Sequence, residues 1–193
     1  ELAKETIEKF KPEINNEELY AIKNIKILFY LNNWNELNIY STSFLKKDTK
    51  KNQYYNDILN ISSNILLFEE DIESLNSYVK SRLKLFQNKR MESIEILNSI
   101  DQLGNTEIKS KIKYDLSRLY LKQEEYQKAI NILNTIDTES AYIESAYLLK
   151  AEIYDYLLNN KSEAVDFYLY ILEEFPHSIH HEAIRLRLRE LTS

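Results

Sequence analysis

The three histidines of the chain lie close together and beside a glutamate, in the run His177, His180, His181 and Glu182. His177 and His181 are four positions apart, a spacing that on one helix face lets two imidazoles share a zinc or nickel ion. Ser178, however, is typical of a helix N-cap, which would place His177 ahead of the helix and out of register with the others. The chain also has no Cys to complete a closed site. We therefore predict no metal site and interpret the histidines as exposed residues of a capping turn.

Clustered carboxylates are the second feature with potential chemistry. Glu69-Glu70-Asp71 has the composition of a divalent-cation cluster, but it lacks the alternating Asp/Asn positions and the Gly of a calcium loop. Acidic residues at a helix start are favoured by the helix macrodipole, so we interpret this run as a helix start. The pairs Glu124-Glu125 and Glu173-Glu174 are predicted to lie on solvated helix ends and not to form an acid/base couple.

Composition removes most routes to catalysis. With no Cys there is no thiol nucleophile, disulfide or thiolate zinc site, and with the single Gly104 there is no Gly-rich phosphate loop and no Gly-x-Ser-x-Gly elbow. We predict that the chain is not an enzyme and binds no cofactor.

Charge and hydropathy exclude two further classes of partner. The net charge is −6 and no basic run is present, which argues against nucleic-acid binding. No apolar run approaches the roughly 20 residues of a membrane span. The chain begins at Glu1 in a sequence that already has helical character, so we expect it to be the C-terminal part of a longer protein.

An internal repeat organises the elements that would carry any site. Tyr114–Asp137 matches Tyr78–Asp101, 36 residues earlier, at 12 of 24 positions. A third copy follows at offsets of 34 and 35, where Tyr120, Ala129 and Leu133 are matched by Tyr154, Ala164 and Tyr168. Self-similarity with this period is the signature of a helical repeat array.

Apolar spacing and the scarcity of Gly and Pro predict helices joined by short links. We expect an all-α fold of about eleven helices, a right-handed solenoid of antiparallel helix pairs. The predicted helices are 2–10, 17–31, 34–47, 54–69, 72–86, 89–100, 107–122, 125–136, 140–158, 162–175 and 178–191. We predict one array over 1–193, made of a degenerate repeat (17–47), an extra helix (54–71), three repeats (75–101, 111–137 and 145–176) and a capping helix (178–191).

The third copy resembles the tetratricopeptide (TPR) repeat, with small residues at Ala151 and Ala164, aromatic residues at Tyr154 and Tyr168, and a closing Pro176. The matching residues are Ser117, Tyr120, Ala129 and Leu133 in the middle copy, and Ser81, Lys84, Ser93 and Leu97 in the first. The resemblance implies close helix crossings at the small residues, and a concave groove that binds peptides or partner domains.

The C-terminal stretch is similar to the last repeat and cap of bacterial cell-envelope TPR proteins. These include the TPR lipoprotein of the outer-membrane barrel-assembly machinery and large TPR proteins of Bacteroidetes-type bacteria. The resemblance is carried by Pro176, Ser178, Arg187 and Arg189. It favours the bacterial periplasm or cell envelope over the cytoplasm.

A repeated Tyr/Arg pair is the candidate partner site. Tyr78 and Arg82 are four residues apart, as are Tyr114 and Arg118 at the equivalent positions, and in TPR proteins these positions line the groove. Lys122 lies one turn further along, and Glu152 is the expected counter-charge from the next repeat. The alternative is that each Arg is simply solvated and covers its neighbour's ring.

Two functions therefore stay open. The first is a non-catalytic adaptor that binds a protein or peptide in its concave groove. The second is an architectural segment of a bacterial cell-envelope complex that makes permanent contacts through its convex face and helix ends. An architectural role predicts large exposed apolar patches, and an adaptor predicts a polar and aromatic groove.

Overall fold

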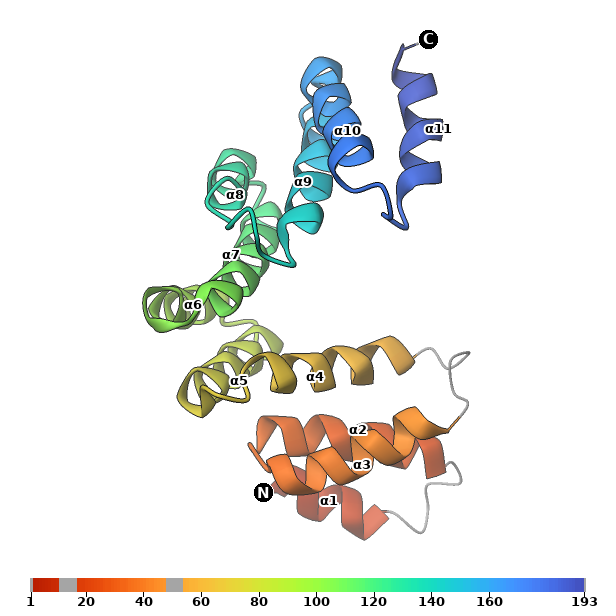
Figure 1. The fold of residues 1–193 in the computed structure, drawn as a ribbon. Coiled ribbons are helices and arrows are strands. Elements are labelled where there is room, and N and C mark those ends of the chain that lie inside the picture. Colours follow the sequence, from red (N-terminus) through yellow and green to blue (C-terminus); the bar gives the residue numbers. More distant parts are fainter. Residues whose placement is uncertain (1, 11–16, 48–53, 193) are drawn as a thin grey trace. The chain divides into compact units, whose positions relative to one another are not determined.

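The computed structural model describes residues 2–10, 17–47 and 54–192, and the regular structure in these ranges is entirely helical (Figure 1). Eleven α-helices and one π-helical segment occur there, without a strand. The all-α prediction is thus confirmed for the described residues. The chain divides into two compact units, Glu1–Ile96 and Leu97–Ser193. The right-handed solenoid and the single array remain predictions.

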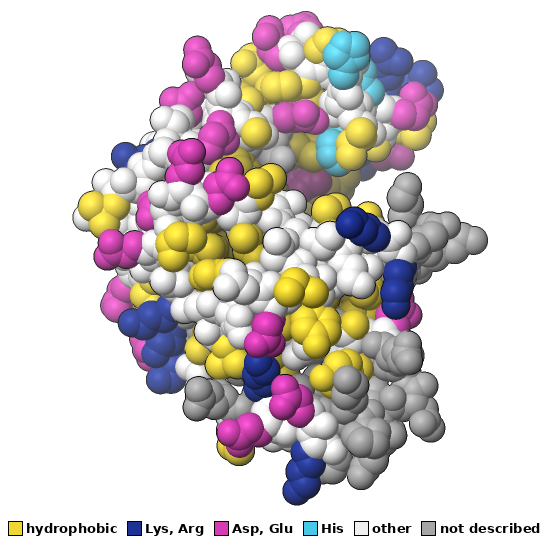
Figure 2. All heavy atoms as spheres, turned by 60° about the horizontal axis from the view of Figure 1, so that its bottom comes forward, with side chains coloured by type: hydrophobic (Ala, Val, Ile, Leu, Met, Phe, Trp, Pro, Cys, Tyr) yellow, Lys and Arg dark blue, Asp and Glu magenta, His cyan; other side chains and the backbone are white. Residues whose placement is uncertain are grey.

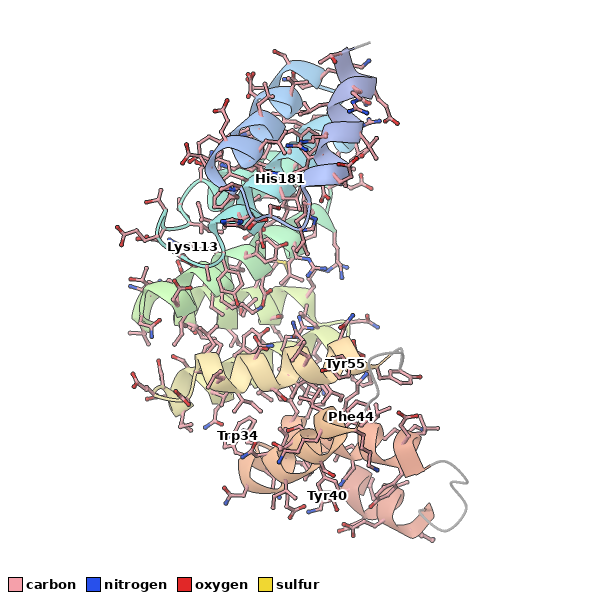
Figure 3. The ribbon with its side chains drawn as sticks, turned by 45° about the vertical axis from the view of Figure 1, so that its right-hand side comes forward. Trp34, Tyr40, Phe44, Tyr55, Lys113 and His181 are labelled. Atoms are coloured by element: carbon pink, nitrogen blue, oxygen red, sulfur yellow. The ribbon has the colours of Figure 1, made fainter. Side chains whose placement is uncertain are left out.

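The N-terminal unit is built around α2. Its helices are α1 (Leu2–Phe10), α2 (Glu17–Tyr30), α3 (Trp34–Lys46), α4 (Tyr55–Leu67), α5 (Ile72–Phe86) and the first part of α6 (Arg90–Leu103). Helix α2 packs against α1, α3, α4 and α5. Trp34, labelled in Figure 3, starts α3 and sets its ring edge-on to Phe29 of α2 at 6.3 Å. Branched aliphatic side chains fill the interior, because each helix presents apolar residues at helical spacing.

The C-terminal unit holds the end of α6 and the helices that follow it. These are α7 (Thr106–Leu121), α8 (Tyr126–Leu133), α9 (Ile143–Glu152), the π segment (Ile153–Leu157), α10 (Lys161–Glu174) and α11 (His181–Thr192). Helix α7 packs against α8, α9 against α8 and α10, and α10 against α11. One core cluster centres on Ala129 and Ala146, and a second on Ala151 and Ala164.

The small residues of the repeat are all buried. In each copy one lies on the first helix and one on the second, and all six have 0% exposure: Ser81 and Ser93, Ser117 and Ala129, Ala151 and Ala164. The two first-helix serines make the same bond, since the hydroxyls of Ser81 and Ser117 each donate to the carbonyl three residues earlier, at 2.7 Å. Small side chains at such positions let helices approach closely.

The helix hairpins turn in the same way. In the described ranges four non-glycine residues have positive φ, and each lies between two successive helices: Asn32 (56°), Asn88 (59°), Glu124 (61°) and Asn159 (52°). In the first three hairpins the next residue donates its N–H to the carbonyl five positions back, for example Glu125 to Tyr120 at 3.0 Å. This is the closure expected after a left-handed residue at a helix end. The recurrence of Leu-Asn-Asn at residues 31–33 and 158–160 thus marks equivalent turns.

The π segment accommodates one inserted residue. In two copies the buried small residue and the left-handed residue are seven positions apart, Ser81 to Asn88 and Ser117 to Glu124. In the third copy, from Ala151 to Asn159, they are eight positions apart. The extra residue widens one turn of the helix, and the closing N–H of Asn160 reaches six residues back, to the Tyr154 carbonyl at 2.8 Å. This inserted residue is the reason why the offset between the second and third copies changes from 34 to 35.

The capping helix begins later than predicted. Helix α11 starts at His181, not at 178, because residues 178–180 form a turn in which the Ser178 hydroxyl accepts the His180 N–H at 3.0 Å. Only His177 is exposed. His180 is half-buried, and the half-buried His181 places its Nε2 2.9 Å from the Phe175 carbonyl oxygen (Figure 3). Interpreting all three histidines as exposed was therefore wrong for these two.

Candidate functional site

An open pocket of about 1140 Å³ lies within the N-terminal unit. It is lined by α1, α2, α4 and α5, and we call it the N-terminal pocket. The predicted residues Tyr78 and Arg82 both line it. Its volume is of the size that holds a ligand of several residues or a drug-sized molecule.

The α5 wall is a stripe of side chains one turn apart. Tyr78 is only 2% exposed and stacks on Phe68 with ring centroids 5.2 Å apart, so it forms the inner end of the wall. Arg82 is exposed in the middle. Phe86 is 78% exposed at the outer end, with its ring 6.3 Å from that of Tyr30. The spacing i, i+4, i+8 keeps all three on one face of the helix.

Two further walls come from α2 and α4. Lys23, Ile27 and Tyr30 line the pocket from α2, and Asn60, Ile61 and Asn64 line it from α4. The buried Asn64 amide donates to the side-chain oxygen of Asn60 at 2.9 Å and to its carbonyl at 2.8 Å. These two bonds fix the amide, so the α4 wall consists of Ile61 beside polar side chains that are held in place.

The lining of the N-terminal pocket carries a net positive charge, although the whole chain is acidic. Lys26 pairs with Asp57 at 2.7 Å and lies over the Tyr54 ring at 5.3 Å. Within the described part of the chain, Lys23 and Arg82 form no ion pair. Among the described lining residues three are cations and one is a carboxylate, which leaves two positive charges available to a ligand.

The other predicted site residues lie in the C-terminal unit. Burial raises the pKa of the Tyr114 phenol, while the charge of Arg118 acts to lower that pKa and the charge of Glu152 acts to raise it. Tyr114 is thus within electrostatic reach of both. Arg118 and Glu152 are exposed and form no ion pair with each other, and Lys122 is the exposed C-cap of α7.

The predicted residues therefore fall into two groups, Tyr78 with Arg82 and Tyr114 with Arg118, Lys122 and Glu152. The two groups lie in different units, so it stays a prediction that they line one groove. Sequence reasoning missed the α2 and α4 walls of the N-terminal pocket. The spacing of Lys23, Ile27 and Tyr30 was a usable signal, but these helices lie outside the clear repeat.

A buried polar cluster in the C-terminal unit is structural. Asp155 of the π segment accepts two bonds from the Arg187 guanidinium at 2.7 Å and one from the Tyr168 hydroxyl at 3.2 Å. The guanidinium holds the pKa of Asp155 below its usual range. A carboxylate that is kept ionised with its lone pairs in use is a poor proton acceptor, so we assign the cluster to fastening α11.

Lys150 is a buried cation without a carboxylate partner in the described ranges. Its ammonium donates to the Asn134 side-chain oxygen at 3.1 Å and lies 3.9 Å from the Tyr147 ring centroid and 4.8 Å from that of Phe167. Burial lowers the pKa of Lys150 to about 8. The two rings offset part of the cost of burying the charge.

No group of three His, Cys, Asp or Glu side chains in the described ranges is arranged to hold a metal ion. No helix there combines the length and apolar character needed to cross a bilayer. On the face shown in Figure 2, acidic side chains are more widespread than basic ones, which stand singly or in small groups.

In comparisons with protein-family models, with curated proteins and with solved structures, no match to this chain was found. The likeness to TPR proteins therefore rests on the repeat residues themselves.

Proposed function

We propose that this chain is a non-catalytic, TPR-like interaction scaffold that holds a peptide or partner domain in a concave groove. The observation that carries the proposal is the N-terminal pocket, where Arg82 of the repeated Tyr/Arg pair stands at an apolar hollow. Exposed cations beside apolar surface suit recognition of a partner with both acidic and apolar groups. The four predicted residues of the C-terminal unit, with Arg118 and Lys122 exposed, extend the same chemistry.

The test is partner capture by the charge-reversed double variant Arg82→Glu with Arg118→Glu. Partners that the wild type retains from a cell extract should be lost, because both arginines are exposed and unpaired in the described structure. The matched control is Arg185→Glu with Arg189→Glu, two exposed arginines of α11. Equal capture by wild type and the Arg82/Arg118 variant, with unchanged circular dichroism, would remove these residues from the partner site.

A second candidate, an architectural segment of a larger assembly, is favoured by large apolar side chains that stand in solvent. Leu103 and Ile179 are the most exposed, at 83% and 91%. In this proposal the C-terminal resemblance places the assembly in a bacterial cell envelope. Replacing both residues by Lys should then abolish assembly without affecting capture through Arg82 and Arg118, and sedimentation of the isolated chain measures the difference.

A further inference from the structure

We infer that the N-terminal pocket binds a short amphipathic helix whose apolar face carries acidic residues at its edges. The inference rests on the proposed function, since it names the class of partner that this part of the scaffold takes. It concerns the N-terminal unit alone, so it can fail while the scaffold proposal stands.

The dimensions of the pocket suit a helix of two to three turns. Its α5 wall runs from Tyr78 to Phe86, and its α2 wall from Lys23 to Leu31, the residue after the end of the helix. Eight residues of helix rise by about 12 Å, so each wall faces about two turns of a bound helix. Apolar residues at i, i+3 or i+4, and i+7 of the ligand would meet the aliphatic lining residues Ile27, Ile61 and Leu83.

The two unpaired cations of the pocket predict acidic residues along the edges of the ligand's apolar face. Lys23 stands on one wall and Arg82 on another, and neither has an acidic partner among the described residues. A carboxylate on each side of the apolar face of the ligand would pair with one of them, and Arg82 offers a bidentate fork. The paired Lys26 and Asp57 are already satisfied by each other, at 2.7 Å.

The charged lining favours a peptide over a lipid chain. The polar groups do not decide, because Thr6 donates to the Leu2 carbonyl and Asn64 donates to Asn60. A single-chain carboxylate seated in the pocket would pair with only one of the two cations, Lys23 and Arg82. An amphipathic helix with acidic residues along both edges pairs with both.

The experiment measures fluorescence anisotropy of a labelled helical peptide of about three turns, with Leu on one face and Glu along both edges. A second peptide replaces each Glu by Lys, and a third has the composition of the first in scrambled order. We expect the acidic peptide to bind at least about tenfold more tightly than either of the others, and to bind more weakly as salt rises.

Variants of the protein locate the site. Lys23→Glu with Arg82→Glu should weaken binding of the acidic peptide about tenfold or more and favour the Lys peptide. Phe86→Ala should weaken binding of both charged peptides, and its exposed ring can be removed without disturbing the core. Arg118→Glu, in the other unit, should leave the affinity unchanged.

Three outcomes would overturn the inference. The first is equal affinity for the acidic and scrambled peptides. The second is binding of oleate, a single-chain carboxylate, without binding of the acidic peptide. The third is a dimer of the chain that Phe86→Asp dissociates, which would show a second copy in the pocket. Partner capture that still depends on Arg118 would preserve the scaffold proposal in every one of these cases.

Discussion

Arg187 of the terminal helix donates two hydrogen bonds to the Asp155 carboxylate of the π segment, from Nε to Oδ2 and from Nη2 to Oδ1, both at 2.7 Å. The Asp155 side chain is 1% exposed, whereas the guanidinium reaches solvent and also pairs with Glu190. The Arg187 side chain lies over the Tyr156 ring, at 4.8 Å from the guanidinium carbon to the ring centroid. These contacts attach α11 to the preceding helix pair, and the cap depends on them.

Replacing Arg187 by Met should lower the melting temperature clearly more than replacing the exposed Arg189 by Met. The reason is that Met leaves the buried Asp155 carboxylate ionised without its cation, which costs more than losing an exposed charge. Thermal melts followed by circular dichroism at neutral pH measure the difference. Equal melting temperatures for the two variants would show that the pair does not hold the cap.

The same pair predicts a pH dependence. Because Arg187 lowers the pKa of Asp155 below its unfolded value, the pair contributes stability above the unfolded pKa, about 3.9, and loses it as pH falls through the folded pKa. The stability difference between wild type and Asp155→Asn should therefore be largest near neutral pH and shrink in acid. Urea titrations at several pH values below neutrality test this, and a difference independent of pH would contradict it.

Glu124 is the only residue other than Asn with positive φ in the described ranges. A left-handed conformation costs most residues about 1–2 kcal/mol, whereas Gly and Asn adopt it readily. Glu124→Gly should therefore stabilise the chain by about 0.5–1 kcal/mol, since the added flexibility of the unfolded chain offsets part of the gain. Asn159→Gly is the control and should change stability less. A loss of stability in Glu124→Gly would indicate an unrecognised role for its side chain.

Lys150→Met should stabilise the chain at neutral pH by about 1–3 kcal/mol, because Met fills the space between the rings without a buried charge. The folded pKa of Lys150, about 8, lies below the unfolded value near 10.4. Between these values the unfolded state binds more protons, so wild-type stability rises with pH and the advantage of the variant should fade. Denaturation at neutral and at alkaline pH gives the comparison, with the exposed Lys161→Met as control. An unchanged advantage at high pH would show that folding does not lower the pKa of Lys150.

Ala164→Trp should destabilise the chain by roughly 1–3 kcal/mol or more, because Ala164 has 0% exposure in the second core cluster and the larger ring overpacks it. Glu173→Gln, on the exposed face of the same helix, should change stability by less than about 0.5 kcal/mol. Equal melting temperatures would show that Ala164 does not lie at a close crossing.

Sequence periodicity predicted the helices because their apolar spacing and short links are local properties of the chain. The repeated small residues were also predictable, since both neighbouring copies have Ser or Ala at the positions of Ser117 and Ala129. The N-terminal pocket was not, because it needs α2, which belongs to the degenerate repeat, and α4, which lies outside the repeats. Tyr78 was predicted on a groove from its spacing to Arg82, but the same i, i+4 pair also allows the observed arrangement, with the ring largely in the core.

The π segment could be located from the sequence but not interpreted. The offset between copies changes from 34 at Tyr120 and Tyr154 to 35 at Ala129 and Ala164, so one residue is added between them. The sequence does not say whether a loop or a helix holds it. In the structure the helix holds it, and Asn159 keeps the left-handed turn that Asn88 and Glu124 occupy in the earlier copies.

A residue inserted into a helix normally rotates the residues after it by about 100° about the helix axis, so that buried side chains become exposed. Here the widened turn at Ile153–Leu157 takes up that rotation within a single segment, and Ala164 returns to the position that Ala129 holds one copy earlier. Duplicated copies of such a unit can therefore drift in length without losing the hairpin. An evolutionary search for relatives of this chain should allow single-residue gaps inside its helices as well as between them.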